Sequence, residues 1–359
     1  MKNVLITRTD RLGDVILSLP VAATIKGADP QTRVTFLVAE PVAPIVSLCP
    51  WVDDCLTLGE ESDSSSHAAR LREHRFDTAI CLYPRSQLAS RLKQAGIPVR
   101  VGTARRWYSY RFTRRVNLSR ASSGCHERDL NLELLRGLGW SKFTISDPLC
   151  IPTQDSQRAA RILLDKAGFD WKQHPYAVVH PGCGGSARNW KPERYRQLCQ
   201  TLKENGLAVL VTGLNSEKQL AADVVGETKD GIASLAGATD LTTLAALLQQ
   251  ASVFVGPSTG PMHLAAAVGT PVVALFGPVR TTGPDRWGPL GTGHQVFVPP
   301  VDTCDCRVDH CRLGDCMDMI DVQPVAGAAI RAAASDKRVG QPRGSVEKAP
   351  GQECPGHQT

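Results

Sequence analysis

The stretch of the chain that decides its fold spans residues 253–278 and reads VFVGPSTGPMHLAAAVGTPVVALFGP. The run VFV predicts a short strand that stops at a Gly-Pro pair, and the small residues after it lead into an apolar helix. Ser258 or Thr259 suits the N-cap of that helix, while Pro261 suits its first turn, where a missing N–H leaves no hydrogen bond unmade. The helix ends at Gly269, and PVVALFG predicts the next buried strand. This order of elements indicates an α/β domain.

The turn between the first strand and the helix, residues 258–260, predicts an anion site. Its backbone N–H groups belong to a helix start at the carboxyl end of a parallel strand, where phosphate is the usual occupant. An ordinary connection within an α/β domain is the alternative interpretation.

Strands alternate with helices throughout the chain, in two sets. The first set predicts strands at 3–7, 33–39, 77–82 and 99–102, and helices at 14–26, 86–96 and 129–139. The second set predicts further strands at 176–180, 207–212 and 232–235, and helices at 193–205, 216–226 and 240–250. Alternation of this kind indicates parallel sheets. We therefore predict an α/β chain with two doubly wound, Rossmann-like parallel-sheet domains that face a cleft.

The expected domain boundaries follow from these sets. The N-terminal domain spans residues 1–160, with a linker at 148–157, and the C-terminal domain spans residues 161–332. The tail, residues 333–359, is rich in Gly, Pro and charge without periodicity, which predicts disorder.

The sequence also indicates the cellular compartment in which the protein is found. No apolar run approaches the roughly 20 residues that a membrane-spanning helix needs. Arg8, Asp10 and Arg11 stand where a signal peptide would need apolar residues, so we expect the protein to stay in the cytoplasm. Most of the twelve cysteines stand singly in apolar segments, as Cys81 and Cys199 do, which is typical of reduced core thiols.

The positive charge is concentrated in one segment, residues 85–120. This segment has ten Arg or Lys and no Asp or Glu, so the remainder of a chain with net charge +6 carries −4, since the ten cations exceed the total by four. It includes Arg105 and Arg106, with aromatic residues such as Trp107 and Tyr110 among the arginines. Such a segment predicts an anionic partner: a phosphorylated substrate, an acidic lipid headgroup or a nucleic acid. A solvated basic face without a partner is the alternative.

The loop after the first strand, RTDRLGD at residues 8–14, carries candidate catalytic groups. It offers Asp14 at a helix start, with Arg8, Arg11 and Gly13 beside it. A carboxylate there either complements the helix dipole or faces the cleft and takes a proton from a hydroxyl.

The matching loop of the second half is HPGCGGSARNWKPERY, residues 180–195. Its glycines permit close backbone approach, and Arg188 and Lys191 offer positive charge to a phosphate. No Gly-Lys-Ser/Thr follows, so it is not a P-loop. Neither half has the Gly-x-Gly-x-x-Gly pattern with a downstream acid, which disfavours a nicotinamide cofactor.

Three of these stretches together resemble glycosyltransferase family 9, the bacterial heptosyltransferases of lipopolysaccharide core assembly. They are RTDRLGDVILSLP at residues 8–20, the HPG loop with its Arg-Asn-Trp-x-Pro-Glu segment, and the stretch quoted first. HERDLNLELLRGLG at residues 126–139 is similar to a further family segment, and the resemblance covers about residues 1–330. It implies a GT-B fold, an ADP-activated sugar bound mainly by the second domain, an acceptor bound by the first, and inversion at the anomeric carbon.

The resemblance also implies roles for single residues. The catalytic aspartate of the family falls on Asp14, and an acid that holds the donor ribose falls on Glu217. The candidate donor-binding residues are Ser186, Arg188, Lys191, Glu217, Ser258, Thr259, Gly260, Pro261, Met262 and His263. The candidate acceptor-binding residues are Arg8, Arg11, Gly13, Arg105 and Arg106.

The sequence departs from the family pattern at donor positions. Arg188 stands where the family usually has Lys, which keeps the positive charge but changes its reach and hydrogen-bonding geometry. Lys191 takes the place where many members have the first proline after Trp. Ser258 stands where many members have an Asp thought to contact the donor sugar, so the identity of that sugar stays open.

We therefore predict an inverting glycosyltransferase that moves a hexosyl or heptosyl group, with heptose preferred, from an ADP-sugar to a lipopolysaccharide-core-type acceptor. Asp14 would accept the proton of the attacking hydroxyl, and Arg188 would stabilise charge on the leaving diphosphate. No Asp-x-Asp pair occurs, so we expect no carboxylate-held Mg²⁺ and no required cofactor. The expected partners are a nucleotide sugar and an anionic glycolipid at the inner face of the cytoplasmic membrane, with no nucleic acid.

One group of cysteines offers a metal site as a minor interpretation. Cys304, Cys306, Cys311 and Cys316 lie within thirteen residues, with His310 among them. Four thiols could hold a structural zinc ion, but Cys-x-Cys is tighter than the usual gap. Reduced thiols or a disulfide are the other interpretations.

Three other functions stay open. They are a glycosyltransferase that uses another NDP-sugar, a nucleotide-sugar epimerase or hydrolase of the same fold, and a non-catalytic nucleotide- or nucleic-acid-binding protein. The ten cations of residues 85–120 argue against the epimerase, because a small substrate does not need them, and they are the only support for the last.

Overall fold

The computed structural model describes residues 1–57, 64–120, 124–141, 143, 148–168, 174–227, 230–302 and 315–335. They form two compact α/β units that divide after Ile151. Within these residues, no helix is both long enough and apolar enough to cross a bilayer.

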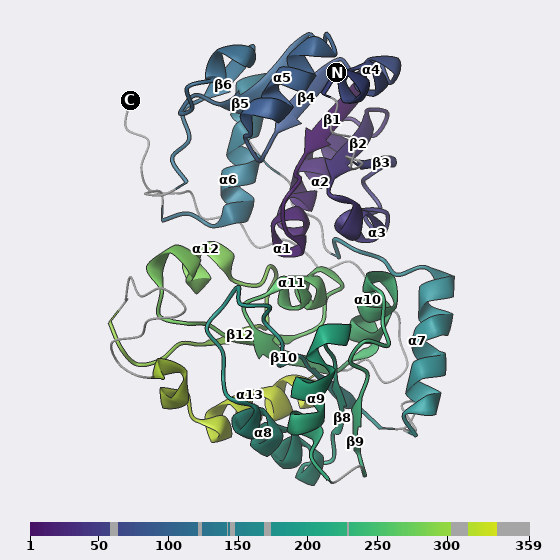
Figure 1. Ribbon diagram of the computed structural model, residues 1–359, viewed down its shortest axis with the longest axis vertical. Helices are drawn as coiled ribbons and strands as arrows, with labels where there is room; N and C mark the ends of the chain where they lie inside the picture. Colours follow the sequence, from purple (N-terminus) through teal and green to yellow (C-terminus); the bar gives the residue numbers. More distant parts are fainter. Residues whose placement is uncertain are drawn as a thin grey trace. The chain divides into compact units, whose positions relative to one another are not determined.

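The first unit is built on a parallel sheet of six described strands in the order β3-β2-β1-β4-β5-β6 (Figure 1). The strands are β1 (Asn3–Thr7), β2 (Arg33–Val38), β3 (Asp54–Thr57), β4 (Thr78–Cys81), β5 (Val99–Thr103) and β6 (Arg114–Val116). The α-helices are α1 (Leu12–Ile16), α2 (Leu19–Ala28), α3 (Ala43–Val46), α4 (Ser64–Glu73), α5 (Ser86–Gln94) and α6 (Glu127–Glu133). Short 3₁₀ turns are η1 (Glu40–Val42), η2 (Ser109–Arg111) and η3 (Leu134–Leu138).

The second unit has its own parallel sheet of six described strands in the order β12-β11-β10-β7-β8-β9. The strands are β7 (Tyr176–Val179), β8 (Ala208–Val211), β9 (Ile232–Ser234), β10 (Val253–Pro257), β11 (Val272–Leu275) and β12 (Gln295–Phe297). The α-helices are α7 (Gln154–Lys166), α8 (Pro192–Glu204), α9 (Lys218–Val225), α10 (Leu241–Gln250), α11 (Gly260–Ala267), α12 (Pro284–Trp287) and α13 (Val322–Ser335). The 3₁₀ turns are η4 (Asn215–Glu217), η5 (Arg280–Thr282) and η6 (Cys316–Met319).

Both sheets have the same doubly wound topology. When the strands of each unit are counted along the chain, each sheet has the order 3-2-1-4-5-6. The order therefore reverses between β1 and β4 in the first unit and between β7 and β10 in the second. Loops at the carboxyl ends of two such strands diverge and leave room for a ligand, so these two switch points are the expected binding positions. The predicted pair of doubly wound parallel sheets is confirmed.

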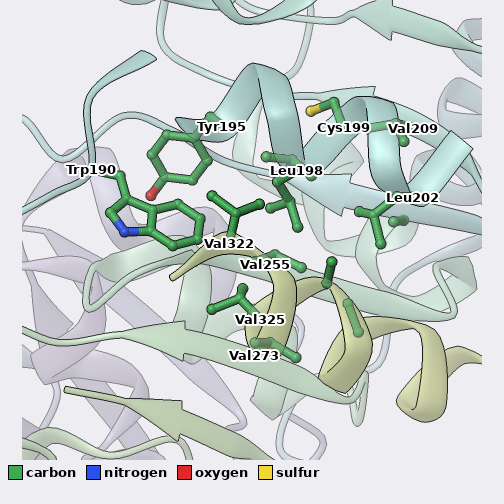
Figure 2. Close-up of a cluster of buried hydrophobic side chains, with 14 of the residues drawn as sticks. Trp190, Tyr195, Leu198, Cys199, Leu202, Val209, Val255, Val273, Val322 and Val325 are labelled. Carbon is green, nitrogen blue, oxygen red and sulfur yellow. The ribbon is translucent and has the colours of Figure 1, made fainter. Parts of the chain in front are cut away.

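The core of the second unit shows why its helices form where they do. On one face of its sheet, Val255 of β10 and Val273 of β11 are buried against α8 and α13. Figure 2 shows Val322 and Val325 of α13 next to these strand residues, with Trp190 near one edge of the cluster. The alternate strand residues, such as Val178, Leu210 and Phe254, have no exposed surface either, so the opposite face is also covered. Strands covered on both faces explain the continuous apolar runs of the sequence.

One predicted helix, residues 14–26, is wrong in its continuity. The structure has two helices there, α1 and α2, which are interrupted at Leu17 and Ser18. Pro20 lies in the first turn of α2 and has no N–H to continue the hydrogen bonds of α1. The Ser18 hydroxyl instead donates to the carbonyl oxygen of Asp14 at 2.7 Å.

The boundary between the units also differs from the expectation at residue 160. Helix α7 begins at Gln154, because the Thr153 hydroxyl caps it by accepting from the N–H of Ser156 at 3.2 Å. The predicted linker at 148–157 therefore includes the first turn of a helix that belongs to the second unit. The predicted tail from Ala333 overlaps the end of α13, and its remainder lies outside the described residues.

Candidate active site

Asp14 lies in the first turn of α1, in the loop that follows β1. Its side chain is 18% exposed, and Oδ1 accepts a hydrogen bond from Nη2 of Arg8. Oδ2 has no hydrogen bond to any other described residue. The carboxylate is therefore held on one oxygen and open on the other.

Arg8 is the centre of a buried charge network. Its side chain is only 3% exposed. Besides Asp14, it donates from Nε to Asp10 Oδ1 at 2.8 Å, from Nη1 to Glu127 Oε1 at 3.0 Å and from Nη1 to Asn131 Oδ1 at 3.1 Å. With every nitrogen of its guanidinium engaged, Arg8 fixes the position of Asp14.

Helix α6 supplies the far side of the network. Glu127 and Asn131 are one helical turn apart and are both fully buried. Glu127 also accepts from Arg120, and the Asn131 side chain donates to the carbonyl oxygen of Leu17 at 3.1 Å, where α1 ends. The α6 segment therefore reaches both Arg8 and the break between α1 and α2.

The network contains three carboxylates, Asp10, Asp14 and Glu127, and two guanidiniums, Arg8 and Arg120. Burial raises the pKa of Asp10 to about 6, and the Asp14 carboxylate adds to this rise, although the attraction of Arg8 opposes it. Burial lowers the pKa of Arg8, but the three carboxylates outweigh it and raise that pKa above its ordinary value. The guanidinium therefore stays charged at every pH at which the protein is folded.

A cavity of about 580 Å³ adjoins this network. It is lined by Tyr83, Pro84, Arg85, Ser86, Gln87, Arg106, Trp107 and Tyr108. These residues come from the loop after β4 with the first turn of α5, and from the loop after β5. The Tyr83 ring links cavity and network, because the Arg8 guanidinium lies 5.7 Å from its centroid.

The five candidate acceptor-binding residues differ in burial and location in the structure. Arg8 is buried in the network, Gly13 is half-buried in α1, and Arg11 is exposed at the start of α1. Arg105 and Arg106 are exposed on the loop after β5, where Arg106 lines the cavity. All the polar contacts of the Arg8 side chain are internal, which favours a positioning role over contact with a ligand.

In the second unit, the loops after β7 and β8 meet around Glu217. His180 follows β7 and is buried, with Nδ1 3.0 Å from the Thr212 hydroxyl. Burial lowers the pKa of His180 to about 4, although Glu217 opposes this, so the imidazole is neutral at pH 7. Glu217 accepts from the N–H of Leu214 at 2.8 Å, and a Cβ on Gly182 would lie 2.2 Å from its Oε1. Only glycine at position 182 leaves this carboxylate where it is.

The loop after β10 leads into α11 and contains the predicted anion turn. Thr259 stands at the N-cap, as expected, but its hydroxyl lies 3.4 Å from the Pro257 carbonyl oxygen and does not cap the helix. Ser258, Gly260 and Pro261 are half-buried, and Met262 and His263 are buried in the first turns of α11. The helix start carries no acidic side chain in its first turn. Its geometry fits an anion at this switch point.

The HPG loop is anchored at its end. Trp190 Nε1 donates to the carbonyl oxygens of Met317 and Ile320 at 3.1 and 3.2 Å, and Lys191 Nζ lies 2.8 Å from Asp318 Oδ2. The ion pair with Asp318 raises the pKa of Lys191. Lys191 thus holds the loop to the segment before α13, and its predicted contact with the donor finds no support in these neighbours.

Arg188 and Ser186 lie in the same loop. A Cβ on Gly277, which follows β11, would lie 2.8 Å from Cβ of Arg188. The loop after β7 therefore passes closely over the end of β11. The exposed Ser186 donates its hydroxyl to the Cys183 carbonyl oxygen at 2.7 Å, which tightens the glycine turn.

Sequence reasoning missed most of the charge network: Asp10, Arg120, Glu127 and Asn131 were not among the predicted site residues. A signal was present, because the segment 126–139 stood out and places Glu127 and Asn131 four positions apart, which puts them on the same face of a helix. The cysteine cluster is not tested, since Cys304, Cys306 and Cys311 lie outside the described residues. No group of potential metal ligands occurs within the described part of the chain.

The sequence of this chain is similar to a known protein family and to characterised relatives. The sequence profile of glycosyltransferase family 9 (heptosyltransferase) matches residues 65–316. Lipopolysaccharide heptosyltransferase 3 of Escherichia coli strain K12 is 28% identical over 285 residues, which cover 74% of this chain and 79% of that protein.

Solved structures share the fold. The glycosyltransferase family 9 protein of Veillonella parvula superposes with a TM-score of 0.80 at 20% identity, covering 93% of this chain and 98% of that one. An Escherichia coli heptosyltransferase with ADP superposes with a TM-score of 0.72 at 20% identity, covering 92% and 99%. The same heptosyltransferase has been solved with ADP-2-deoxy-2-fluoro heptose (TM-score 0.66, 22% identity, covering 90% and 98%). With the two parallel sheets, these likenesses confirm the predicted GT-B fold class.

Proposed function

Since the chain belongs to glycosyltransferase family 9, the heptosyltransferase family, and is thus a glycosyltransferase, we propose that it transfers heptose from ADP-heptose to a lipopolysaccharide-core acceptor with inversion. The observation that carries the mechanism is the placement of Asp14. It is a partly exposed carboxylate at a switch point, tied by one oxygen to an Arg8 that cannot move away. Such a group suits a general base.

The first unit would bind the acceptor and perform the proton transfer. The acceptor hydroxyl gives its proton to Asp14 as its oxygen forms a bond to C1 of the donor sugar. The C1–O bond to the diphosphate breaks on the opposite face, and ADP leaves with the electron pair. Arg8, Glu127 and Asn131 keep the carboxylate in place during the step, which preserves its distance to the hydroxyl.

The second unit would bind the nucleotide. Glu217 lies beside the glycine turn at Gly182, where a ribose hydroxyl could donate to its carboxylate. The start of α11 and Arg188 would face the diphosphate, which gains negative charge as C1–O breaks. Donors fixed in advance at such a position each contribute on the order of 3 kcal/mol to the rate.

The donor sugar and the location belong to the same proposal. The solved heptosyltransferase with ADP and the Escherichia coli relative support ADP-heptose and a lipopolysaccharide acceptor. Ser258, where many members of the family have Asp, makes another sugar on ADP the second candidate. We place the protein in the cytoplasm, bound peripherally to the inner face of the membrane that carries its glycolipid acceptor, and we expect catalysis without a metal or other cofactor.

Calorimetric titration with ADP, UDP and GDP, with and without Mg²⁺, tests the donor site. We expect metal-independent preference for ADP, weakened in Arg188→Ala. An assay of ADP release from ADP-heptose in the presence of lipopolysaccharide core acceptors then tests sugar transfer. The anomeric configuration of the product tests inversion. Preference for UDP or GDP would rule out ADP-heptose as the donor. Retention of the anomeric configuration would rule out Asp14 as the base of a single displacement.

A further inference from the structure

Asp10 belongs to the charge network around Arg8 but has no assigned part in the proton transfer. It lies four residues before Asp14, in the loop after β1, and its side chain is 14% exposed. Arg8 donates to it from Nε at 2.8 Å. Because withdrawing a carboxylate from water costs free energy, the position of Asp10 beside Asp14 calls for a reason.

Asp10 and Asp14 are bound to the same edge of the Arg8 guanidinium. Nε donates to Asp10 and Nη2 donates to Asp14, and these two N–H groups point to one side of the planar group. Nη1 donates to Glu127 and Asn131 instead. Two carboxylates on one edge repel each other, since a like charge nearby disfavours ionisation. Asp10 and Asp14 therefore compete for the positive charge of one guanidinium.

The ionised groups of the network leave one negative charge in excess. Three carboxylates (Asp10, Asp14 and Glu127) meet two guanidiniums (Arg8 and Arg120), so the net charge is −1 when all are ionised. One proton brings the net charge to zero, and a second would bring it to +1. Since the network is largely buried, the second proton is taken up much less readily than the first.

The neighbouring titratable and charged groups do not change this count. Cys81 ends β4 beside the network, and burial raises the pKa of its thiol to about 11, so it stays neutral. Tyr83 meets Arg8 with the face of its ring, whose centroid is 5.7 Å from the guanidinium. Arg11 is exposed at the start of α1. A proton that the network takes up in mild acid therefore goes to one of its own carboxylates.

We propose that Asp10 is a positioning residue that acts through Arg8 to make Asp14 a base. When Asp10 is ionised, the acceptor hydroxyl gives its proton to Asp14 and the net charge of the network passes from −1 to zero. When Asp10 is protonated, the same step has to carry the net charge from zero to +1, and transfer is slow. The inference rests on the proposed function, since it takes Asp14 as the base.

The pH at which this control operates is set by Asp10. Burial raises the pKa of Asp10 to about 6, and the Asp14 carboxylate adds to the rise, although Arg8 opposes it. The charge of Asp10 is therefore present above this pH and is lost as the pH falls through about 6. We expect the rate of sugar transfer to rise as the pH increases from about 5 to about 7.

Single-turnover rates of Asp10→Asn, measured with ADP-heptose and a lipopolysaccharide core acceptor from about pH 5 to pH 8, test this control. The amide keeps the size of the side chain but removes its charge. At pH 8 the rate should fall about 10-fold to 100-fold, because Asp14 is then a weaker base. The rise between about pH 5 and pH 7 should disappear, and Asp10→Glu, which restores the charge, should restore it. A rate that falls by the same factor at every pH would mean that Asp10 serves only the structure, and the proposal fails.

Asp29→Asn is the matched control. Asp29 is an exposed carboxylate of the same unit, and it accepts from the N–H of Gln31 and the hydroxyl of Thr32, outside the network. Its rate and pH profile should match those of the unaltered protein. Ionisation of phosphate groups on the substrates affects every variant alike, so the ratio of two rates isolates the substituted residue. If Asp29→Asn also loses the rise with pH, the effect comes from the general charge of the unit and the proposal is overturned.

Carbon-13 NMR of protein labelled at the aspartate carboxyl carbons separates this inference from the function on which it rests. The signal of Asp10 is identified by its absence from Asp10→Asn. It should titrate with a midpoint of about 6. In Asp14→Asn the midpoint should fall by about one pH unit or more, because a like charge is removed. An unchanged midpoint overturns the proposal even if heptose is transferred. If the midpoint falls but no lipopolysaccharide acceptor is glycosylated, the coupling of the two carboxylates is supported, and the proposed function is what fails.

Discussion

The two units of this chain share a sheet topology and a switch point, yet fill that point differently. At the carboxyl ends of β1 and β4, the first unit places a network of charged side chains around Arg8. At the corresponding ends of β7 and β10, the second unit places glycines, a helix start and a neutral histidine. The same backbone frame thus supports a site made of side chains in one unit and a site made mainly of main chain in the other.

The difference fits two kinds of chemistry. A proton acceptor must be a side chain, and it has to be held in place by others, which Arg8 and α6 provide. A diphosphate is bound well by N–H groups, which need small residues so that the main chain can come close. The comparison predicts that substitutions at the first switch point will affect proton transfer, whereas substitutions at the second will affect nucleotide binding.

The largest effect should come from Asp14→Asn. The amide keeps the size of the side chain but cannot accept the proton. We therefore expect kcat to fall by about 100-fold to 10,000-fold. ADP affinity, measured by calorimetry, should stay within about twofold because the nucleotide is assigned to the other unit. A variant that keeps more than a few per cent of the rate with an unchanged melting temperature would rule out this base.

Next in size is Glu127→Gln, which tests the network rather than the base. The buried Glu127 pairs with both Arg8 and Arg120, and removing one partner of a buried ion pair costs about 3–5 kcal/mol. We expect a loss near the lower end, because the amide oxygen still accepts a hydrogen bond, together with a lower kcat.

The matched control is Glu133→Gln on the same helix, because the side chain of its partner Arg136 is 48% exposed. Chemical unfolding should show a loss below about 1 kcal/mol for this variant. Equal losses in the two variants would mean that the network does not stabilise the first unit.

Acidification should act on the two units with opposite sign. The folded pKa of Asp10, about 6, lies above its ordinary value of 3.8, so its contribution to stability is present below pH 3.8 and is lost as pH rises through 6. The folded pKa of His180, about 4, lies below its ordinary value of 6.5, so its contribution is present above pH 6.5 and is lost as pH falls toward 4. Each change amounts to about 3 kcal/mol at most.

Unfolding free energies of Asp10→Asn and His180→Asn, measured against the unaltered protein between pH 4 and pH 7, check these signs. Asp10→Asn should gain stability relative to the unaltered protein as pH rises, and His180→Asn should gain it as pH falls. Parallel pH curves for the variant and the unaltered protein would contradict the corresponding shift.

The smallest effect is expected from Gly182→Ala. The added methyl group would displace the Glu217 carboxylate, which can rotate, so stability should change little. ADP affinity should fall about fivefold to tenfold if Glu217 binds the ribose. Gly283→Ala, where the new Cβ meets only ordinary contacts at 3.4 Å or more, should leave the affinity unchanged. Equal affinity in both variants would remove Glu217 from the donor site.

Much of the fold could be predicted from the sequence because its signals are local. Buried parallel strands appear as apolar runs, as in the VFV and PVVALFG segments that became β10 and β11. Errors occurred where a single contact or proline decided the outcome, as at Pro20, which separates α1 from α2, and at Thr153, which starts α7.

For the same reason, only part of the site could be predicted from the sequence. Asp14 and the glycine turns could be found from the sequence alone, since each lies in a short loop at a strand end. Arg8 was expected to bind the acceptor, and only the tertiary structure shows that it is buried, because Glu127 and Asn131 come from a helix more than a hundred residues away. The sequence determined two doubly wound domains and a carboxylate at a helix start. Packing of α6 against α2 decided which groups hold Arg8, the residue that this carboxylate contacts.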